Sequence, residues 1–166
     1  MSSDAATFVT RRTALLGLLA VAGCGFRPAY APGGGAAGLQ GAVAVATPDT
    51  ATGFALRTRL EERLGPANAP RFHLRAAMTV EREAAAISGE GDITRLNLVG
   101  AADWTLQDTA GAALLEGRSQ SFTSYSATGS TVATQAAEVD ARDRLAVILA
   151  DMIVADLLAM SADLPA

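Results

Sequence analysis

The chain has 166 residues, a formal net charge of −4 and 13 basic residues, all of them arginine. This acidic balance argues against a nucleic-acid-binding protein, which would need a basic surface patch. Half of the residues are apolar, but aromatic residues make up only 5% and a single cysteine is present. A disulfide framework is therefore excluded, and we expect a thin core built mainly from aliphatic side chains.

The amino-terminal stretch has the layout of a bacterial export signal. Arg11 and Arg12 precede an apolar run that ends in Gly23, directly before the only cysteine, Cys24. The run is too short to span a bilayer. Because a cysteine follows the expected cleavage site, the stretch resembles the lipobox of bacterial lipoproteins, in which that cysteine is acylated. We therefore expect residues 1–23 to be a lipoprotein signal peptide and Cys24 to carry the membrane anchor.

Two alternatives at this end of the chain stay open. The alternative for Cys24 is a small buried hydrophobe, although the glycine- and proline-rich residues after it offer no core. The arginine pair resembles a twin-arginine export motif, but an ordinary Sec signal would also begin with positive charge. Residues 24–38 are predicted to be a lipidated flexible tether, and residues 39–166 a single domain.

The first predicted elements of this domain are a short strand and a helix. Residues 42–46 alternate alanine with valine, which favours a strand. Thr50 or Thr52 is expected to cap the helix that follows, and Gly65 to end it. The predicted apolar face of the helix has leucines at spacing four and a flanking phenylalanine: Leu56, Leu60, Leu64 and Phe54.

The middle of the domain predicts an antiparallel meander. Apolar and polar residues alternate over 71–81 and 95–107, which is typical of half-buried strands, and residues 112–126 form a third strand rich in serine and threonine. Residues 88–92 and 108–111 are expected to be the turns between these strands. The meander should therefore have one apolar and one polar face.

A long helix is expected to close the domain, capped by Ser130 or Thr131 and running to about Met160. Its second half is apolar nearly all round, interrupted only by Asp151 and Asp156. Because such a helix is normally surrounded, it lies either between the sheet and the other helix, which we favour, or partly beneath a partner protein. The elements together predict the α+β fold class.

No catalytic site, metal site or cofactor is expected. The only histidine, His73, lies on the polar face of a strand, and no second histidine or free cysteine would complete a metal site. Without a neighbouring histidine the serines lack a general base. The protein is therefore not expected to be an enzyme.

In its order of elements the chain resembles the LptE family of lipopolysaccharide-assembly lipoproteins. The resemblance also rests on the opening Cys24-Gly25-Phe26-Arg27-Pro28-Ala29-Tyr30, on the stretch from Arg118 to Tyr125, and on the pattern from Glu138 to Leu145. It implies two helices packed on one face of a four-stranded, mostly antiparallel sheet. It further implies a lipid-anchored protein on the periplasmic face of the outer membrane, which plugs the LptD β-barrel and assists lipopolysaccharide assembly at the cell surface.

By the same resemblance, basic residues would contact lipopolysaccharide. The matching turn region, residues 87–95, is acidic at 88–92 in this chain, so the nearest candidates are Arg95 and Arg118, whose guanidinium groups suit phosphate and carboxylate. The alternative for each is a solvated strand arginine. The alternative function is that of an auxiliary lipoprotein of a lipid-transporting ABC system, and co-purification with a barrel or with an inner-membrane transporter would separate the two.

Overall fold

The computed structural model describes residues 35–87 and 93–164. The predicted signal peptide, Cys24, most of the predicted tether and the predicted turn at 88–92 lie outside these residues. The elements follow one another as η1 (Gly35–Gly38), β1 (Val43–Ala46), α2 (Ala51–Leu64), β2 (Phe72–Ile87), β3 (Ile93–Asp108), β4 (Ala113–Ser126), α3 (Thr131–Ala159) and η2 (Ser161–Asp163).

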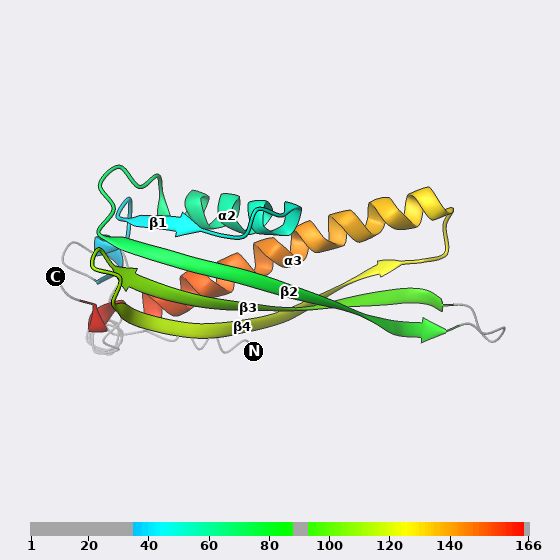
Figure 1. The fold of residues 1–166 in the computed structure, drawn as a ribbon. Helices are drawn as coiled ribbons and strands as arrows, with labels where there is room; N and C mark the ends of the chain where they lie inside the picture. The colour runs from blue at the N-terminus through cyan, green and yellow to red at the C-terminus, as the bar shows by residue number, and fades with distance from the viewer. Residues whose placement is uncertain (1–34, 88–92, 165–166) are drawn as a thin grey trace, which may run out of the picture.

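The four strands form one sheet in the order β1-β2-β3-β4 (Figure 1). β2, β3 and β4 are antiparallel neighbours, as the meander predicts, whereas β1 runs parallel to β2. The parallel pair arises because α2 lies between β1 and β2 in the chain and acts as their crossover, which a parallel pair requires. The sheet is therefore mixed but mostly antiparallel.

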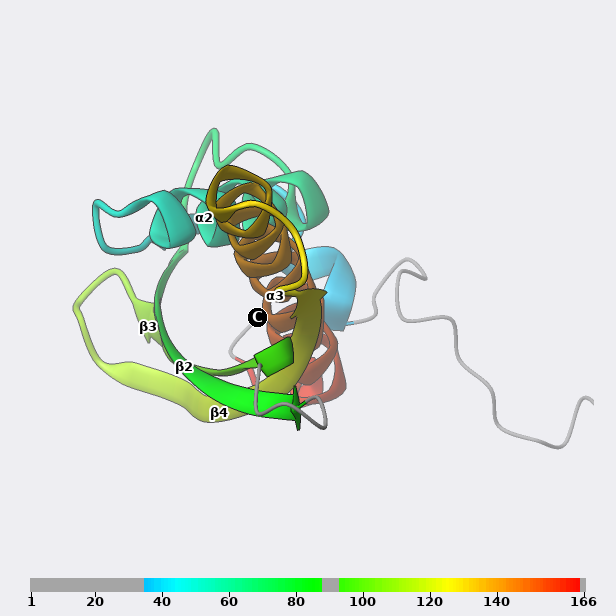
Figure 2. The same cartoon turned by 90° about the vertical axis from the view of Figure 1, so that its right-hand side faces the viewer.

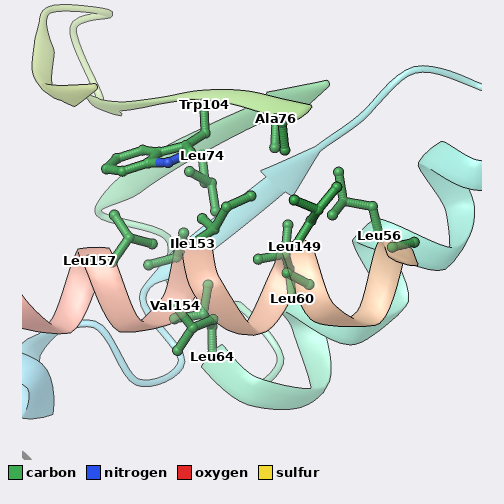
Figure 3. Close-up of a cluster of buried hydrophobic side chains, with 14 of the residues drawn as sticks. Leu56, Leu60, Leu64, Leu74, Ala76, Trp104, Leu149, Ile153, Val154 and Leu157 are labelled. Carbon is green, nitrogen blue, oxygen red and sulfur yellow. The ribbon is translucent and has the colours of Figure 1, made fainter. Parts of the chain in front are cut away.

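Both helices lie on one side of the sheet, as expected (Figures 1 and 2). α2 covers the half of the sheet next to β1, and α3 runs along most of its length. The core fills the space between these layers: it joins leucines of α2 to Leu74 of β2, Trp104 of β3 and a row of α3 residues (Figure 3).

Helix α2 begins and ends where the sequence predicts. The Thr50 hydroxyl accepts a hydrogen bond from the Gly53 N–H at 3.0 Å, so Thr50 and not Thr52 is the cap. Gly65 has φ of 79°, a left-handed conformation that favours glycine after a helix end. The prediction for Phe54 is wrong, since 62% of the side chain is exposed. Phe54 precedes Leu56 by two residues, which places it about 200° around the helix from that buried leucine.

The alternation of β2 and β3 is confirmed. Leu74 and Ala76 on β2, and Leu98 and Trp104 on β3, are buried under the helices. β2 extends to Ile87, well past the predicted end at 81. These inward positions set the spacing between sheet and helices.

Two inward positions of the sheet require glycine because side chains lie directly on the backbone. A Cβ added to Gly117 of β4 would lie 2.5 Å from the Trp104 ring, and one added to Gly100 of β3 would lie 2.7 Å from Leu145. Both approaches are closer than real Cβ contacts. The ring of the single tryptophan therefore lies directly next to the backbone of β4 at Gly117.

Helix α3 packs against the sheet and against α2, but Val147 and Ile148 in its second half are still 39% and 37% exposed, so the alternative of a partner that covers part of this helix stays open. The two aspartates that interrupt its apolar second half bind different elements. Asp151 faces α2, where Arg59 donates to it at 3.0 Å through both Nε and Nη2. Asp156 faces the sheet, where it accepts a hydrogen bond from Ser119 of β4 at 3.1 Å. Each acidic residue therefore serves a different neighbour of the helix. Ser130 caps α3 by accepting from the Ala133 N–H.

Candidate functional site

The outward face of β2, β3 and β4 carries both arginines that sequence reasoning singles out. This face, the free sheet face, is the one turned away from α2 and α3 (Figure 2). Arg95 and Arg118 are both exposed on it. His73 is also exposed on this side, as predicted.

Arg118 is bound to a carboxylate on the neighbouring strand. Its Nη1 donates to the Oδ1 and Oδ2 of Asp103 at 2.7 and 2.6 Å, because the β3–β4 register places these residues directly opposite each other. The pair lines an open hollow of about 770 Å³, together with Arg75 and Glu116. Since both signs of charge line this hollow, it offers no surplus positive field to a polyanion.

Arg95 lies elsewhere on the same face. It pairs with Ser126 of β4 and Ala86 of β2, near the end of the sheet that is remote from β1. Asp103, the partner of Arg118, is eight residues further along β3, or about 26 Å at the usual rise of a strand. The structure therefore does not bring Arg95 and Arg118 into one site.

A polar cluster on the inner face joins the first half of α3 to the sheet. Glu138 accepts from Arg142 at 2.6 Å, from the Tyr125 hydroxyl at 3.0 Å and from Arg82 at 3.2 Å. The hydrogen bond from Arg142 is the main cause that holds the pKa of Glu138 below its ordinary value of 4.5, and Tyr125 and the charge of Arg82 act in the same direction. Burial raises the pKa of the Tyr125 hydroxyl.

Sequence reasoning did not assemble this cluster, although two signals for it were present. Glu138 and Arg142 stand at the i, i+4 spacing of helical ion pairs. Arg82 has the same parity as the inward residues Met78 and Val80, which shows that β2 turns an arginine toward the helices. These polar contacts hold the first half of α3 against the sheet, next to the apolar core. The cluster does not pair a nucleophile with a general base, so it is not a catalytic arrangement.

The described part of the chain holds no group of three or more metal-ligating side chains. Nor is any helix among residues 35–87 and 93–164 both long and apolar enough to cross a membrane.

Comparison with known proteins identifies the family. The family model LptE, described as lipopolysaccharide-assembly, matches residues 41–157. The chain belongs to the LptE family. The match to LptE extends from the residues just before β1 to the last turn of α3, so it covers nearly the whole two-layer domain. No curated protein sequence matches the chain.

Solved structures similar to this LptE chain include lipoproteins from several bacteria. A candidate lipoprotein from Caulobacter crescentus CB15 superposes with a TM-score of 0.62 at 25% identity, covering 80% of this chain and 98% of the other. A minor lipoprotein from Acinetobacter baumannii gives a TM-score of 0.57 at 19% identity, covering 70% and 90%. Rare lipoprotein B from Shewanella oneidensis gives 0.56 at 13% identity, covering 73% and 96%. At these identities the latter two support the fold alone.

Proposed function

We propose that this chain is a lipid-anchored outer-membrane protein that plugs the LptD β-barrel from its periplasmic side and assists the assembly of lipopolysaccharide at the cell surface. The observation that carries the proposal is the LptE family match over residues 41–157. That match spans the strands and helices that give the domain its shape.

The anchor is proposed to be the acylated Cys24. Two or more acyl chains hold a protein firmly at a bilayer, whereas one chain holds it only marginally. An acylated amino terminus followed by a flexible tether keeps the domain within a few nanometres of the membrane. The anchor then holds the protein at the membrane, and the folded domain provides the shape of the plug.

A plug of this kind works without an active site. It needs a rigid body, which the continuous core between the sheet and the two helices supplies. It also needs surfaces that suit the polar lumen of a membrane barrel. The free sheet face suits such a lumen because most of its side chains are polar or charged.

Arg95 and Arg118 are proposed to contact lipopolysaccharide in different ways. The ion pair with Asp103 already neutralises the charge of Arg118, so Arg118 would act as a hydrogen-bond donor through the N–H groups that do not contact Asp103. Arg95 stands at the other end of the face and would meet a different part of the ligand. Because the two residues are too far apart to act as a unit, substitution of either one is expected to remove only its own contact.

Depletion of the protein in its own host tests the proposal. We expect surface lipopolysaccharide and mature, oxidised LptD both to fall, and both to return with the wild-type gene but not with Cys24→Ser. Normal levels of both after depletion would contradict the proposal. Recovery of an inner-membrane transporter, and not a barrel, with the tagged protein would favour the ABC-system alternative.

A further inference from the structure

The free sheet face has one apolar feature, formed by Phe122 of β4 and Val99 of β3. The two residues are directly opposite each other in the ladder, with 65% of Phe122 and 37% of Val99 exposed. Within residues 43–46, 72–86, 94–108 and 113–126 of the sheet, these are the only large apolar side chains left exposed. They line an open hollow of about 370 Å³ with Asn97, Gln120 and Ser121. An aromatic anchor with neutral hydrogen-bonding neighbours has the composition of an interface centre.

We propose that this pair, the Phe122 spot, docks against the inner wall of the barrel partner, where Phe122 enters an apolar socket. The inference rests on the proposed function and specifies which face of the domain meets the partner. Phe122 is the proposed anchor because burial of a phenylalanine contributes more than that of any other side chain on this face.

The curvature of the sheet selects a concave partner. Seen along the strands, the sheet curls around the helix layer, so the free sheet face is the convex one (Figure 2). A second copy of the chain would present the same convex face. Two convex faces touch over a small area, whereas a stable interface needs about 800 Å² from each partner. The inner wall of a barrel is concave and follows such a face over its length.

The charges beside the Phe122 spot favour a protein partner over an anionic lipid group. Glu81 of β2 lies directly opposite Val99 on the same face, and Glu83 follows it at the next outward position. Both glutamates are exposed. They repel phosphate, so these charges disfavour an anionic lipid group at the Phe122 spot.

Two exposed phenylalanines on opposite layers of the molecule provide a matched test. Full-length, lipidated protein carrying Phe122→Ser or Phe54→Ser is purified by an affinity tag from detergent-solubilised envelopes, and the barrel recovered per chain is measured. Phe122→Ser is expected to lower the recovery about tenfold, as for an interface anchor. Phe54→Ser is expected to leave it within about twofold, because Phe54 is equally exposed but lies on α2. Far-UV circular dichroism and Trp104 emission check that each variant is folded.

The outcomes separate the inference from the proposed function. Recovery of the barrel by wild type and by Phe122→Ser alike would overturn the inference and leave the plug function standing. Loss with both serine variants would overturn it as well, since the effect would not belong to this face. Absence of a barrel with the wild-type chain would overturn the proposed function itself.

A second measurement does not depend on the substitution being tolerated. A photo-crosslinking phenylalanine analogue at position 122 keeps an aromatic ring at the site and is expected to give a chain–barrel adduct, whereas the same analogue at position 54 gives none. A chain–chain adduct at position 122, together with dimers of the purified wild type in sedimentation equilibrium, would show instead that a second copy covers the face.

Discussion

Glu138 joins helix α3 to two strands of the sheet through polar contacts. Its carboxylate is held by Arg142 from the same helix, and by Tyr125 and Arg82 from two different strands. Only 18% of the side chain is exposed. Because an anion at this depth needs its partners, the three donors and the carboxylate stabilise one another.

The first prediction concerns the pH dependence of stability at this residue. The pKa of Glu138 is lower in the folded protein than its ordinary 4.5. The stabilisation is therefore complete above about pH 5 and is lost as the pH falls through the lowered folded value. We expect Glu138→Gln to lower the free energy of unfolding by about 1–3 kcal/mol at pH 7, and the difference from wild type to shrink as the pH falls below the ordinary pKa of 4.5.

Urea denaturation followed by Trp104 fluorescence at several pH values measures this difference. Glu116→Gln is the matched control, since Glu116 is exposed on the free sheet face. A difference between wild type and Glu138→Gln that stays constant down to pH 3 would contradict the assignment.

At the scale of elements, two kinds of contact hold α2 against α3. Leu56, Leu60 and Leu64 are buried in the shared core, with at most 2% exposed. Asp151 of α3 binds Arg59 and lies 3.7 Å from Arg63, but between 29% and 42% of these three side chains is exposed. Solvent screens such pairs, so the leucines are expected to dominate.

The second prediction compares these contacts directly. Leu60→Ala is expected to lower the free energy of unfolding by about 2–5 kcal/mol, because it leaves a cavity between the two helices. Asp151→Asn is expected to lower it by less than about 1 kcal/mol. Both are measured by urea denaturation at neutral pH and low salt. If Asp151→Asn cost as much as Leu60→Ala, the ion pair and not the leucines would hold α2 in place.

At the scale of the whole molecule, the segment ahead of β1 belongs to the same core as the sheet and helices. Leu39 is 1% exposed and lies in the main cluster. The N–H of Gly41 donates to the carbonyl of Leu64 at 2.7 Å, which ties this segment to the end of α2. The folded core therefore includes residues ahead of the first strand.

The third prediction follows from these contacts. A fragment of residues 35–166 is expected to unfold in one transition, with far-UV circular dichroism and Trp104 fluorescence changing together. A fragment that begins at residue 43 lacks Leu39 and is expected to be less stable by about 2–4 kcal/mol. Two separate transitions in the longer fragment would show that the sheet and helices are not one cooperative unit.

Local patterns in the chain were sufficient to predict the features that depend on sequence neighbours. Alternation placed the inward residues of β2 and β3, and spacing four placed the leucines of α2, because each regular structure repeats its direction at a characteristic period. Capping chemistry reduced each helix start to two candidates, and the structure decides for Thr50 over Thr52 and for Ser130 over Thr131. The LptE resemblance, which the family match confirms, also came from these local patterns and their order.

The tertiary structure alone decided which distant residues meet. β4 has few apolar side chains, so its alternation did not reveal that Tyr125 points inward and Phe122 outward. The register between β3 and β4 places Arg118 opposite Asp103 and Arg95 opposite Ser126, so the two arginines do not share one site. That register is set by the pairing of the two strands and not by either strand alone. Asp151 and Asp156 found their partners on different elements through packing, and a linear pattern carries no information on such contacts.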